Sequence, residues 1–127
     1  MVGTNLAYSL HFYAGSHGQP LRDKADYALS KGLAIFITEW GTTHADGGSS
    51  DRKVYTEASA QWLAWADQRQ IPWANWSLMD KDESSSALLP GASNKGAWPE
   101  VALSPSGRWV REQIRKRSSP PATPATR

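Results

Sequence analysis

Two hydrophobic patterns alternate along this chain. The short, mainly apolar runs, which are rich in β-branched and aromatic residues and predict β-strands, are residues 6–13, 34–38 and 73–78. The segments in which apolar side chains recur three or four positions apart, as on one face of a helix, are residues 20–32, 55–65 and 105–114. This order predicts an α/β fold whose three strands lie parallel, because right-handed crossovers connect parallel neighbours.

The ends of these elements carry their own signals. Pro20 suits the first position of a helix, and Gly32 suits the position just after its last turn. Ser104 and Pro105 mark the start of the last helix in the same way. The loop of about twenty residues before them is long for a compact domain, and such loops are usually functional or disordered.

The run at residues 34–38 is the predicted strand that bears most directly on function. It is apolar and bounded by Gly32 and Gly41, which predicts a strand buried on both faces. Glu39 then stands at the C-terminal tip of this strand. Parallel sheets and barrels bind ligands and mount catalytic side chains at that end, so Glu39 is well placed for chemistry.

Other polar and aromatic residues occupy equivalent places on the neighbouring strands. His11 and Tyr13 are two positions apart near the end of the first strand, so they point to the same side. Trp76 lies in the third strand. We expect these residues and Glu39 to meet in one pocket, although each alone also fits a packing or surface role. The chain has seven tryptophans, and indole rings that are not in the core suit flat, hydroxyl-rich ligands such as sugars.

Composition excludes several classes of function. The 127 residues suffice for one domain, and 39% hydrophobic with 20% charged residues is typical of a globular chain. The net charge of +2 comes mostly from the last helix, where basic residues favour the helix dipole, so we predict no nucleic-acid binding. No apolar run approaches the ~20 residues of a membrane span. With no cysteine, no HExxH motif and three dispersed histidines, we expect no metal site and no cofactor.

The chain divides into a domain and a tail. Residues 118–127 contain three prolines and no apolar residue larger than alanine, which predicts an extended, unfolded linker after a domain at residues 1–117. Residues 1–4 do not read as a signal peptide, so an export signal would have to lie outside this chain.

Five motifs carry a family resemblance. They are HFYAGSHG at residues 11–18, ITEWGT at 37–42, WANWSL at 73–78, DKDES at 80–84 and LSPSG at 103–107. Over residues 5–117 the chain resembles the C-terminal part of bacterial endoglucanases of glycoside hydrolase family 5. The resemblance implies a (β/α)8 TIM barrel to which these residues supply strands six, seven and eight. Residues 1–117 would then be a partial barrel.

The resemblance also implies roles for six residues. Glu39 would be the catalytic nucleophile, with His11 and Tyr13 supporting it and the sugar at the cleavage point. The residues that would bind the β-glucan are Trp76, as the platform under that sugar, and Lys81 and Glu83, which would hold hydroxyls of the neighbouring sugar on the non-reducing side.

Half of the expected site is missing. A retaining glycosidase needs a nucleophile and, about 5 to 5.5 Å away, a second carboxyl group that protonates the departing oxygen. The family carries this acid/base in an Asn-Glu pair after strand four, and the sequence contains no such pair. Since a whole barrel takes about 250 residues, this chain supplies only three of eight units.

Two interpretations of function remain open. In the first, the chain is the nucleophile-bearing part of an endo-β-1,4-glucanase that acts on cellulose or a related β-glucan, with a mannanase as the weaker alternative. In the second, it is a non-catalytic remnant that only binds β-glucan through Trp76 and its neighbours. The family resemblance also implies a secreted protein.

The incomplete barrel leaves two apolar strand edges, at residues 6–13 and 73–78. Such edges pair with something or aggregate. Two copies about a twofold axis would cover them and bring two Glu39 side chains together, one ionised as nucleophile and one protonated as acid. We therefore expect a homo-oligomer that completes the barrel as one source of the missing acid.

Overall fold

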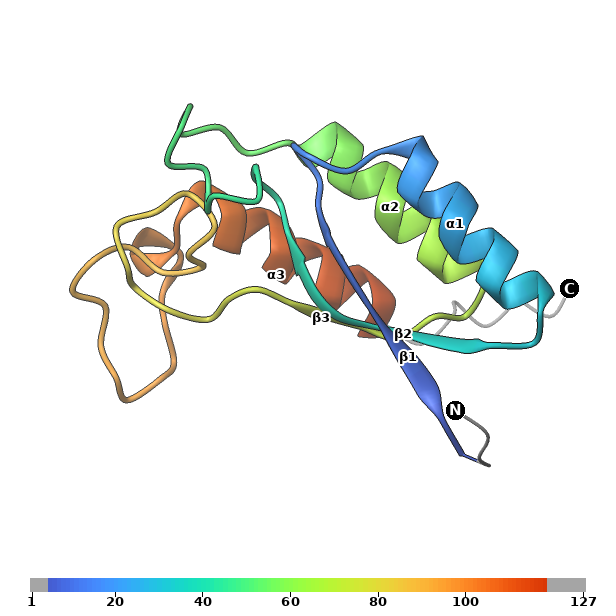
Figure 1. Cartoon of the computed structure of the whole chain (residues 1–127). Coiled ribbons are helices and arrows are strands. Elements are labelled where there is room, and N and C mark those ends of the chain that lie inside the picture. The colour runs from blue at the N-terminus through green and yellow to red at the C-terminus, as the bar shows by residue number, and fades with distance from the viewer. Residues whose placement is uncertain (1–4, 119–127) are drawn as a thin grey trace, which may run out of the picture.

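The computed structural model describes residues 5–118, in which strands and helices alternate as predicted (Figure 1). The elements are β1 Ala7–Tyr13, α1 Gln19–Ser30, β2 Ala34–Gly41, α2 Thr56–Gln68, β3 Trp73–Asn75, the 3-10 turn η1 Glu100–Ala102 and α3 Pro105–Ser118. No helix in this part of the chain is long and apolar enough to span a membrane. Residues 1–4 and most of the predicted linker, residues 119–127, lie outside the described residues.

The three strands form one parallel sheet in the order β1-β2-β3. The prediction of parallel strands joined by helices is therefore confirmed. Figure 1 shows the helices on one side of this sheet. The order also makes β1 and β3 the two edge strands, as expected from the apolar runs at residues 6–13 and 73–78.

Aromatic side chains fill the layer between the sheet and the helices. Phe12 stacks on Trp62 of α2 at a ring-centroid distance of 4.1 Å and on Trp40 of β2 at 5.5 Å. The edge of Trp40 meets Trp73 at 5.5 Å and Trp109 of α3 at 6.3 Å. Phe12, Trp40 and Trp62 are fully buried. These rings hold β1 and β2 against α2 and α3, so the core fixes the strands that carry the predicted site.

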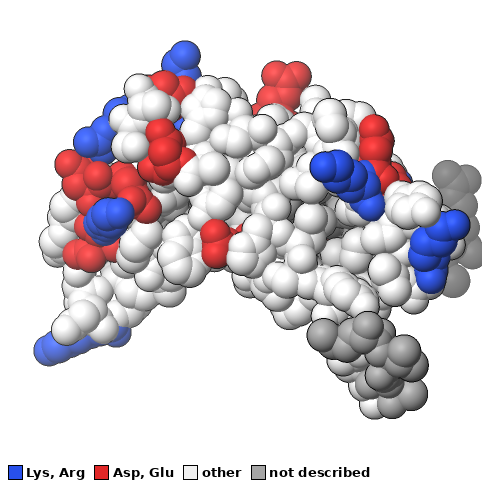
Figure 2. Space-filling model, viewed as in Figure 1, with Lys and Arg blue, Asp and Glu red and all other residues white. Residues whose placement is uncertain are grey.

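The other face of β2 is open, and the prediction of a strand buried on both faces is wrong. Ile37 is fully buried, whereas its neighbour Phe36 is 38% exposed and Thr38 is also exposed. The physical reason is that helices cover one face only, and three strands cannot curl far enough to cover the other. Figure 2 shows the molecule hollowed below the sheet, with few charged side chains in the hollow.

The third strand is shorter than residues 73–78. Pairing with β2 continues as far as Trp76, whose backbone N–H donates to the Trp40 carbonyl oxygen at 2.7 Å. The chain then leaves the sheet, because the carbonyl oxygens of Ser77 and Met79 accept the N–H groups of residues 87 and 88, each at 3.0 Å. Residues 77–79 thus hydrogen-bond to the long loop that follows them, instead of to β2.

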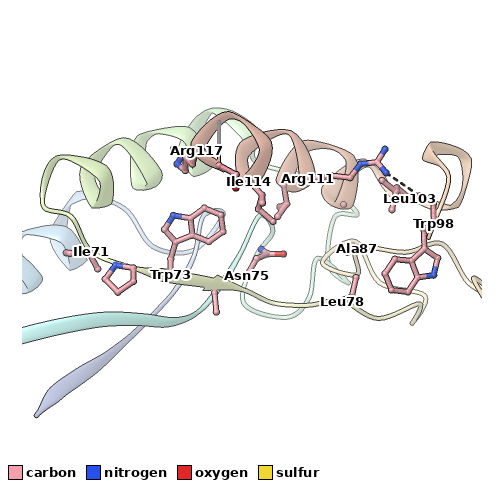
Figure 3. Close-up of a pocket in the computed structure, with 15 residues that line it drawn as sticks. Ile71, Trp73, Asn75, Leu78, Ala87, Trp98, Leu103, Arg111, Ile114 and Arg117 are labelled. Carbon is pink, nitrogen blue, oxygen red and sulfur yellow. Dashed lines mark hydrogen bonds between the residues drawn. The ribbon is translucent and has the colours of Figure 1, made fainter. Parts of the chain in front are cut away.

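A groove of about 650 Å³ lies between β3 and α3 (Figure 3). Its lining is mostly apolar, with Ile71, Trp73 and Leu78 along the strand side and Val110 and Ile114 on the helix. Val110 is buried, but Ile114, which shares its helical face, is half exposed. The groove therefore marks an uncovered edge, where a further strand and helix would extend the same layers.

Candidate active site

An extra residue in β2 decides which way Glu39 faces. Two steps along β1, from Ser9 to His11, correspond to three steps along β2, and β3 shows the same offset against β2. Ile37 and Trp40 are both fully buried although they are three positions apart, which strict alternation would forbid. The register shift, of the kind that a β-bulge produces, keeps Trp40 in the core and turns Glu39 to the open face.

Thr38 and Glu39 consequently share the open face, and both approach His11. The His11 Nε2 atom lies 2.9 Å from the Thr38 hydroxyl, and its Nδ1 lies 3.7 Å from Glu39 Oε2. The Thr38 hydroxyl also hydrogen-bonds to the Ser9 hydroxyl on β1. Thr38 was not predicted as a site residue, because the alternation rule places it on the face opposite Glu39.

Tyr13 binds the Glu39 carboxylate directly. Its hydroxyl donates to Oε1 at 2.6 Å, and the Glu39 side chain is 24% exposed. Burial, this hydrogen bond and the negative charges of Glu39 and Glu83 raise the pKa of Tyr13 above its ordinary value of 10.0. The Tyr13 phenol therefore stays protonated and keeps its hydrogen bond to the Glu39 carboxylate. A Cβ at Gly41 would lie 2.5 Å from the Tyr13 ring, so only glycine lets the ring lie there.

The backbone of Trp76 is anchored to Trp40, the residue that follows Glu39, and Trp76 is about half exposed. Its backbone N–H and the Asn75 side-chain amide both donate to the Trp40 carbonyl oxygen, at 2.7 and 3.0 Å. The residue is nevertheless 47% exposed. The backbone of Trp76 is thus anchored next to the strand of Glu39, while about half of the residue's surface stays exposed.

Lys81 and Glu83 form an ion pair in the long loop. The Glu83 side chain is only 12% exposed, and it accepts hydrogen bonds from Lys81 Nζ and from the Ser85 hydroxyl at 2.7 Å. Burial alone would raise the pKa of Glu83, but the hydrogen bonds from Lys81 and Ser85 and the Lys81 charge outweigh it and lower the pKa. Glu83 is therefore an ionised acceptor at neutral pH, which is unsuited to a general acid.

The structure thus brings the predicted residues together to different degrees. His11, Tyr13 and Glu39 contact one another through Glu39. Glu83 acts on Tyr13 through its charge, and Lys81 is held by Glu83. Within residues 5–118, the side chains that form a hydrogen bond or an ion pair with the Glu39 carboxylate are Tyr13 and His11, and neither supplies a second carboxyl group. The described residues also contain no cluster of three or more side chains suited to a metal ion.

A second hydrogen-bonded network supports the loop after β2 and was not predicted. The Tyr55 hydroxyl donates to Asp51 Oδ2 at 2.7 Å and lies 2.8 Å from His44 Nε2. The other ring nitrogen of His44 lies 3.2 Å from the Ser16 hydroxyl in the turn after β1. Tyr55 was expected within the second helix, whereas it precedes that helix as its N-cap residue. Nothing in the local sequence pattern links these four residues.

This network predicts a loss of stability in acid. The Tyr55 hydroxyl, followed by the Lys53 backbone N–H, lowers the pKa of Asp51 below its ordinary value of 3.8. The folded state then binds fewer protons than the unfolded state, so the stabilisation is complete above that value and is lost as the pH falls below it. We expect the melting temperature to fall as the pH drops below about 3.8, and to fall less in Asp51→Asn. If the melting temperature fell equally steeply with pH in the parent and in Asp51→Asn, Asp51 would not be the source of the acid sensitivity.

The comparisons with known proteins agree with the geometry. The family model described as cellulase (glycosyl hydrolase family 5) matches residues 2–82. The chain belongs to glycosyl hydrolase family 5. Among curated relatives, Endoglucanase A of Evansella cellulosilytica is 53% identical over 121 residues, which are 94% of this chain and 24% of the relative. The chain spans about a quarter of the length of this relative and of a second one, Endoglucanase N of Pectobacterium atrosepticum.

Solved structures give the same result for the fold of this family 5 chain. A protein from Cytophaga hutchinsonii matches with a TM-score of 0.84 and 43% identity, over 89% of this chain and 36% of that one. The catalytic domain of Thermobifida fusca endoglucanase Cel5A, in complex with cellotetraose, matches with a TM-score of 0.80 and 28% identity, over 89% and 36%. The predicted family and the predicted fold, part of a family 5 (β/α)8 barrel, are both confirmed.

Proposed function

We propose that this chain carries the nucleophile half of a retaining endo-β-1,4-glucanase site that acts on cellulose or a related β-glucan. One observation carries the proposal: the Glu39 carboxylate, near the C-terminal end of β2, is held by the Tyr13 hydroxyl at 2.6 Å, and the half-exposed Trp76 pairs through its backbone with Trp40, the residue after Glu39. The printed names of the relatives, which are endoglucanases, and the cellotetraose complex of the Thermobifida fusca protein support a β-1,4-glucan as the ligand.

The chemistry requires an ionised and correctly aimed Glu39. In the first step a Glu39 oxygen forms a bond to the anomeric carbon while the glycosidic C–O bond breaks. The Tyr13 hydroxyl donates to one Glu39 oxygen at 2.6 Å and so orients the carboxylate, and His11 Nδ1 lies 3.7 Å from the other oxygen. Water then cleaves the glycosyl-enzyme ester and releases the sugar.

The acid/base carboxyl group must come from outside residues 5–118. It would protonate the departing oxygen in the first step and accept a proton from water in the second. Glu83, the other carboxylate near the site, is paired with Lys81 and kept ionised, so we assign it to substrate binding. A second copy of this chain as the source of the acid finds no support in the relatives, where the matching segment is about a third of one longer chain.

Sugar binding would use Trp76, Lys81 and Glu83. The face of an indole suits the apolar C–H face of a pyranose. The Glu83 carboxylate already accepts two donors and has further lone pairs for sugar hydroxyls, whereas the exposed Lys81 ammonium can donate. Secretion, which the family resemblance implies, stays a prediction.

Replacing Trp76 by alanine should weaken β-glucan binding. We expect a loss of about 0.5 to 1.5 kcal/mol in the binding free energy of cello-oligosaccharides, because the stacking contact is lost while the backbone anchor remains. Calorimetric titration measures it. Tyr27→Ala, which removes an exposed ring on α1, is the matched control and should bind like the parent. Equal affinities of Trp76→Ala and the parent would remove Trp76 from the site.

A β-glucan-binding chain without catalysis is the second candidate function. It is favoured by the missing second carboxyl group, because the binding residues are present without it. Parallel measurements of cellotetraose affinity and of reducing-end release from a soluble cellulose derivative separate the two functions. Binding with no hydrolysis under any supplementation supports the second candidate. Hydrolysis that depends on Glu39 supports the first, and mannan in place of the cellulose derivative tests the mannanase alternative.

A further inference from the structure

The first turn of α3 holds the loop that carries Glu83. The Ser104 N–H donates to the Ala87 carbonyl oxygen at 3.0 Å. The Ser104 hydroxyl donates to the carbonyl oxygen of Ser86. The same hydroxyl accepts the Gly107 N–H at 3.0 Å, which confirms Ser104 as the cap of the last helix. Ser86 is fully buried and Ser104 nearly so. One hydroxyl therefore joins the helix start to the loop.

Gly107 brings the two backbones into direct contact. A Cβ at this position would lie 1.9 Å from the Ala87 carbonyl oxygen and 2.7 Å from its carbonyl carbon. Both obstacles are backbone atoms, so no side-chain rotation could relieve the overlap. Any residue other than glycine must push the loop away from the helix.

The same turn is tied to the strand that carries the nucleophile. The Ser106 hydroxyl lies 2.7 Å from the Thr42 hydroxyl, and both side chains are buried. Thr42 is the residue after β2 and comes three positions after Glu39. The turn thus contacts both the loop of Glu83 and the residue that follows the strand of Glu39.

The path from the turn to the Glu83 carboxylate is short. The Ser86 N–H donates to the Glu83 carbonyl oxygen at 3.1 Å, and the Ser85 hydroxyl donates to the Glu83 carboxylate at 2.7 Å. The Ser85 N–H also donates to the Gly47 carbonyl oxygen at 3.1 Å. Moving residues 86 and 87 would therefore move both the backbone and the hydrogen-bond donor of Glu83.

We propose that residues 104–107 are a positioning element that sets where the Glu83 carboxylate stands relative to Glu39, and hence which glucan hydroxyls it reaches. The inference rests on the proposed function, because it takes Glu83 as a hydroxyl acceptor. Ser104 and Gly107 are positioning residues that act through Glu83. One helical turn thus fixes the position of the sugar-binding loop relative to the strand that carries the nucleophile.

Gly107→Ala tests the proposal, with Gly18→Ala as the matched control. A Cβ at Gly18, which precedes α1, meets nothing within 4 Å. The first readout is the Glu83 carboxyl titration followed by carbon NMR, and the second is the affinity for cellotetraose. In Gly107→Ala we expect the pKa of Glu83 to rise towards its ordinary value of 4.5 and the affinity to fall about tenfold. Gly18→Ala should match the parent in both.

A double-mutant cycle shows whether Gly107 acts through Glu83. The effect of Gly107→Ala on affinity should vanish in the Glu83→Gln background. A general structural weakening would instead lower the affinity in both backgrounds. A folded Gly107→Ala chain in which Glu83 titrates as in the parent would overturn the proposal.

Ser104 provides a milder route if Gly107→Ala does not fold. Ser104→Ala removes the hydroxyl that joins Ser86 to the helix start, and it should shift the Glu83 titration in the same direction. Ser104→Thr keeps the hydroxyl and should restore the parent's titration, so failure of both effects would overturn the proposal. A parent chain that does not bind cellotetraose would count against the proposed function alone, because the Glu83 titration still decides the positioning role.

Discussion

Glu39→Gln is expected to abolish any hydrolysis of β-1,4-glucan that this chain supports, while leaving its melting temperature nearly unchanged. The amide has the shape of the carboxylate and its oxygen can still accept the Tyr13 hydroxyl, so the packing at the end of β2 is kept. It cannot attack the anomeric carbon as an anion. Losing a covalent nucleophile costs on the order of 10⁴-fold or more in rate.

The measurement is reducing-end release from a soluble cellulose derivative, with the chain alone and combined with the remaining barrel units of a family 5 relative. Glu57→Gln is the matched control, because Glu57 is an exposed glutamate on α2. It should retain the parent's rate. Hydrolysis by Glu39→Gln at the parent's level would show that the nucleophile has been assigned wrongly.

Trp62→Ala should have the largest effect on stability. Trp62 is fully buried, stacks on Phe12 at 4.1 Å and donates its indole N–H to the His17 carbonyl oxygen at 2.8 Å. Truncation removes the ring, leaves a cavity and orphans that carbonyl oxygen. Such changes cost about 3 to 5 kcal/mol, a large part of the total stability of a single domain.

Urea unfolding followed by circular dichroism measures this loss. Trp76→Ala is the matched control, because it removes the same side chain from a half-exposed position and should change the free energy of unfolding much less. Trp62→Phe should fall between the two, since it keeps a ring against Phe12 but cannot donate to His17. A Trp62→Ala chain as stable as Trp76→Ala would mean that the aromatic layer does not hold the fold.

The elements and their order could be predicted because they depend on local pattern. Pro20, Gly32 and Ser104 stand within a residue or two of the helix limits in the structure. Parallel pairing followed from the alternation of strands and helices, without any knowledge of contacts. The edge strands then followed from the order of the three units.

The errors arose where tertiary contacts override the local pattern. The run at residues 34–38 is apolar enough for burial on both faces, but the chain supplies helices for only one. Residues 76–78 look like a strand, yet Ser77 pairs with residue 87 instead of β2. In both cases the partner that decides the outcome lies far away in the sequence.

The site itself was only partly predictable. Glu39, His11 and Tyr13 could be placed together from strand ends, but the shift that makes Thr38 face His11 breaks the two-residue period on which strand predictions rely. The roles of Ser104 and Gly107 depend on contacts with residues 86 and 87, and no sequence spacing reveals such contacts.

A substrate whose leaving group needs no acid tests most directly whether this chain holds a competent nucleophile without its acid partner. A dinitrophenyl 2-fluoro-β-cellobioside loses its phenolate without protonation, and the fluorine slows release of the bound sugar. Peptide mass spectrometry then locates the label. The account predicts a cellobiosyl ester on Glu39, none in Glu39→Gln, and no cleavage of unactivated cellotetraose by residues 1–127 alone. An unlabelled Glu39, or a label on Glu83 instead, would contradict it.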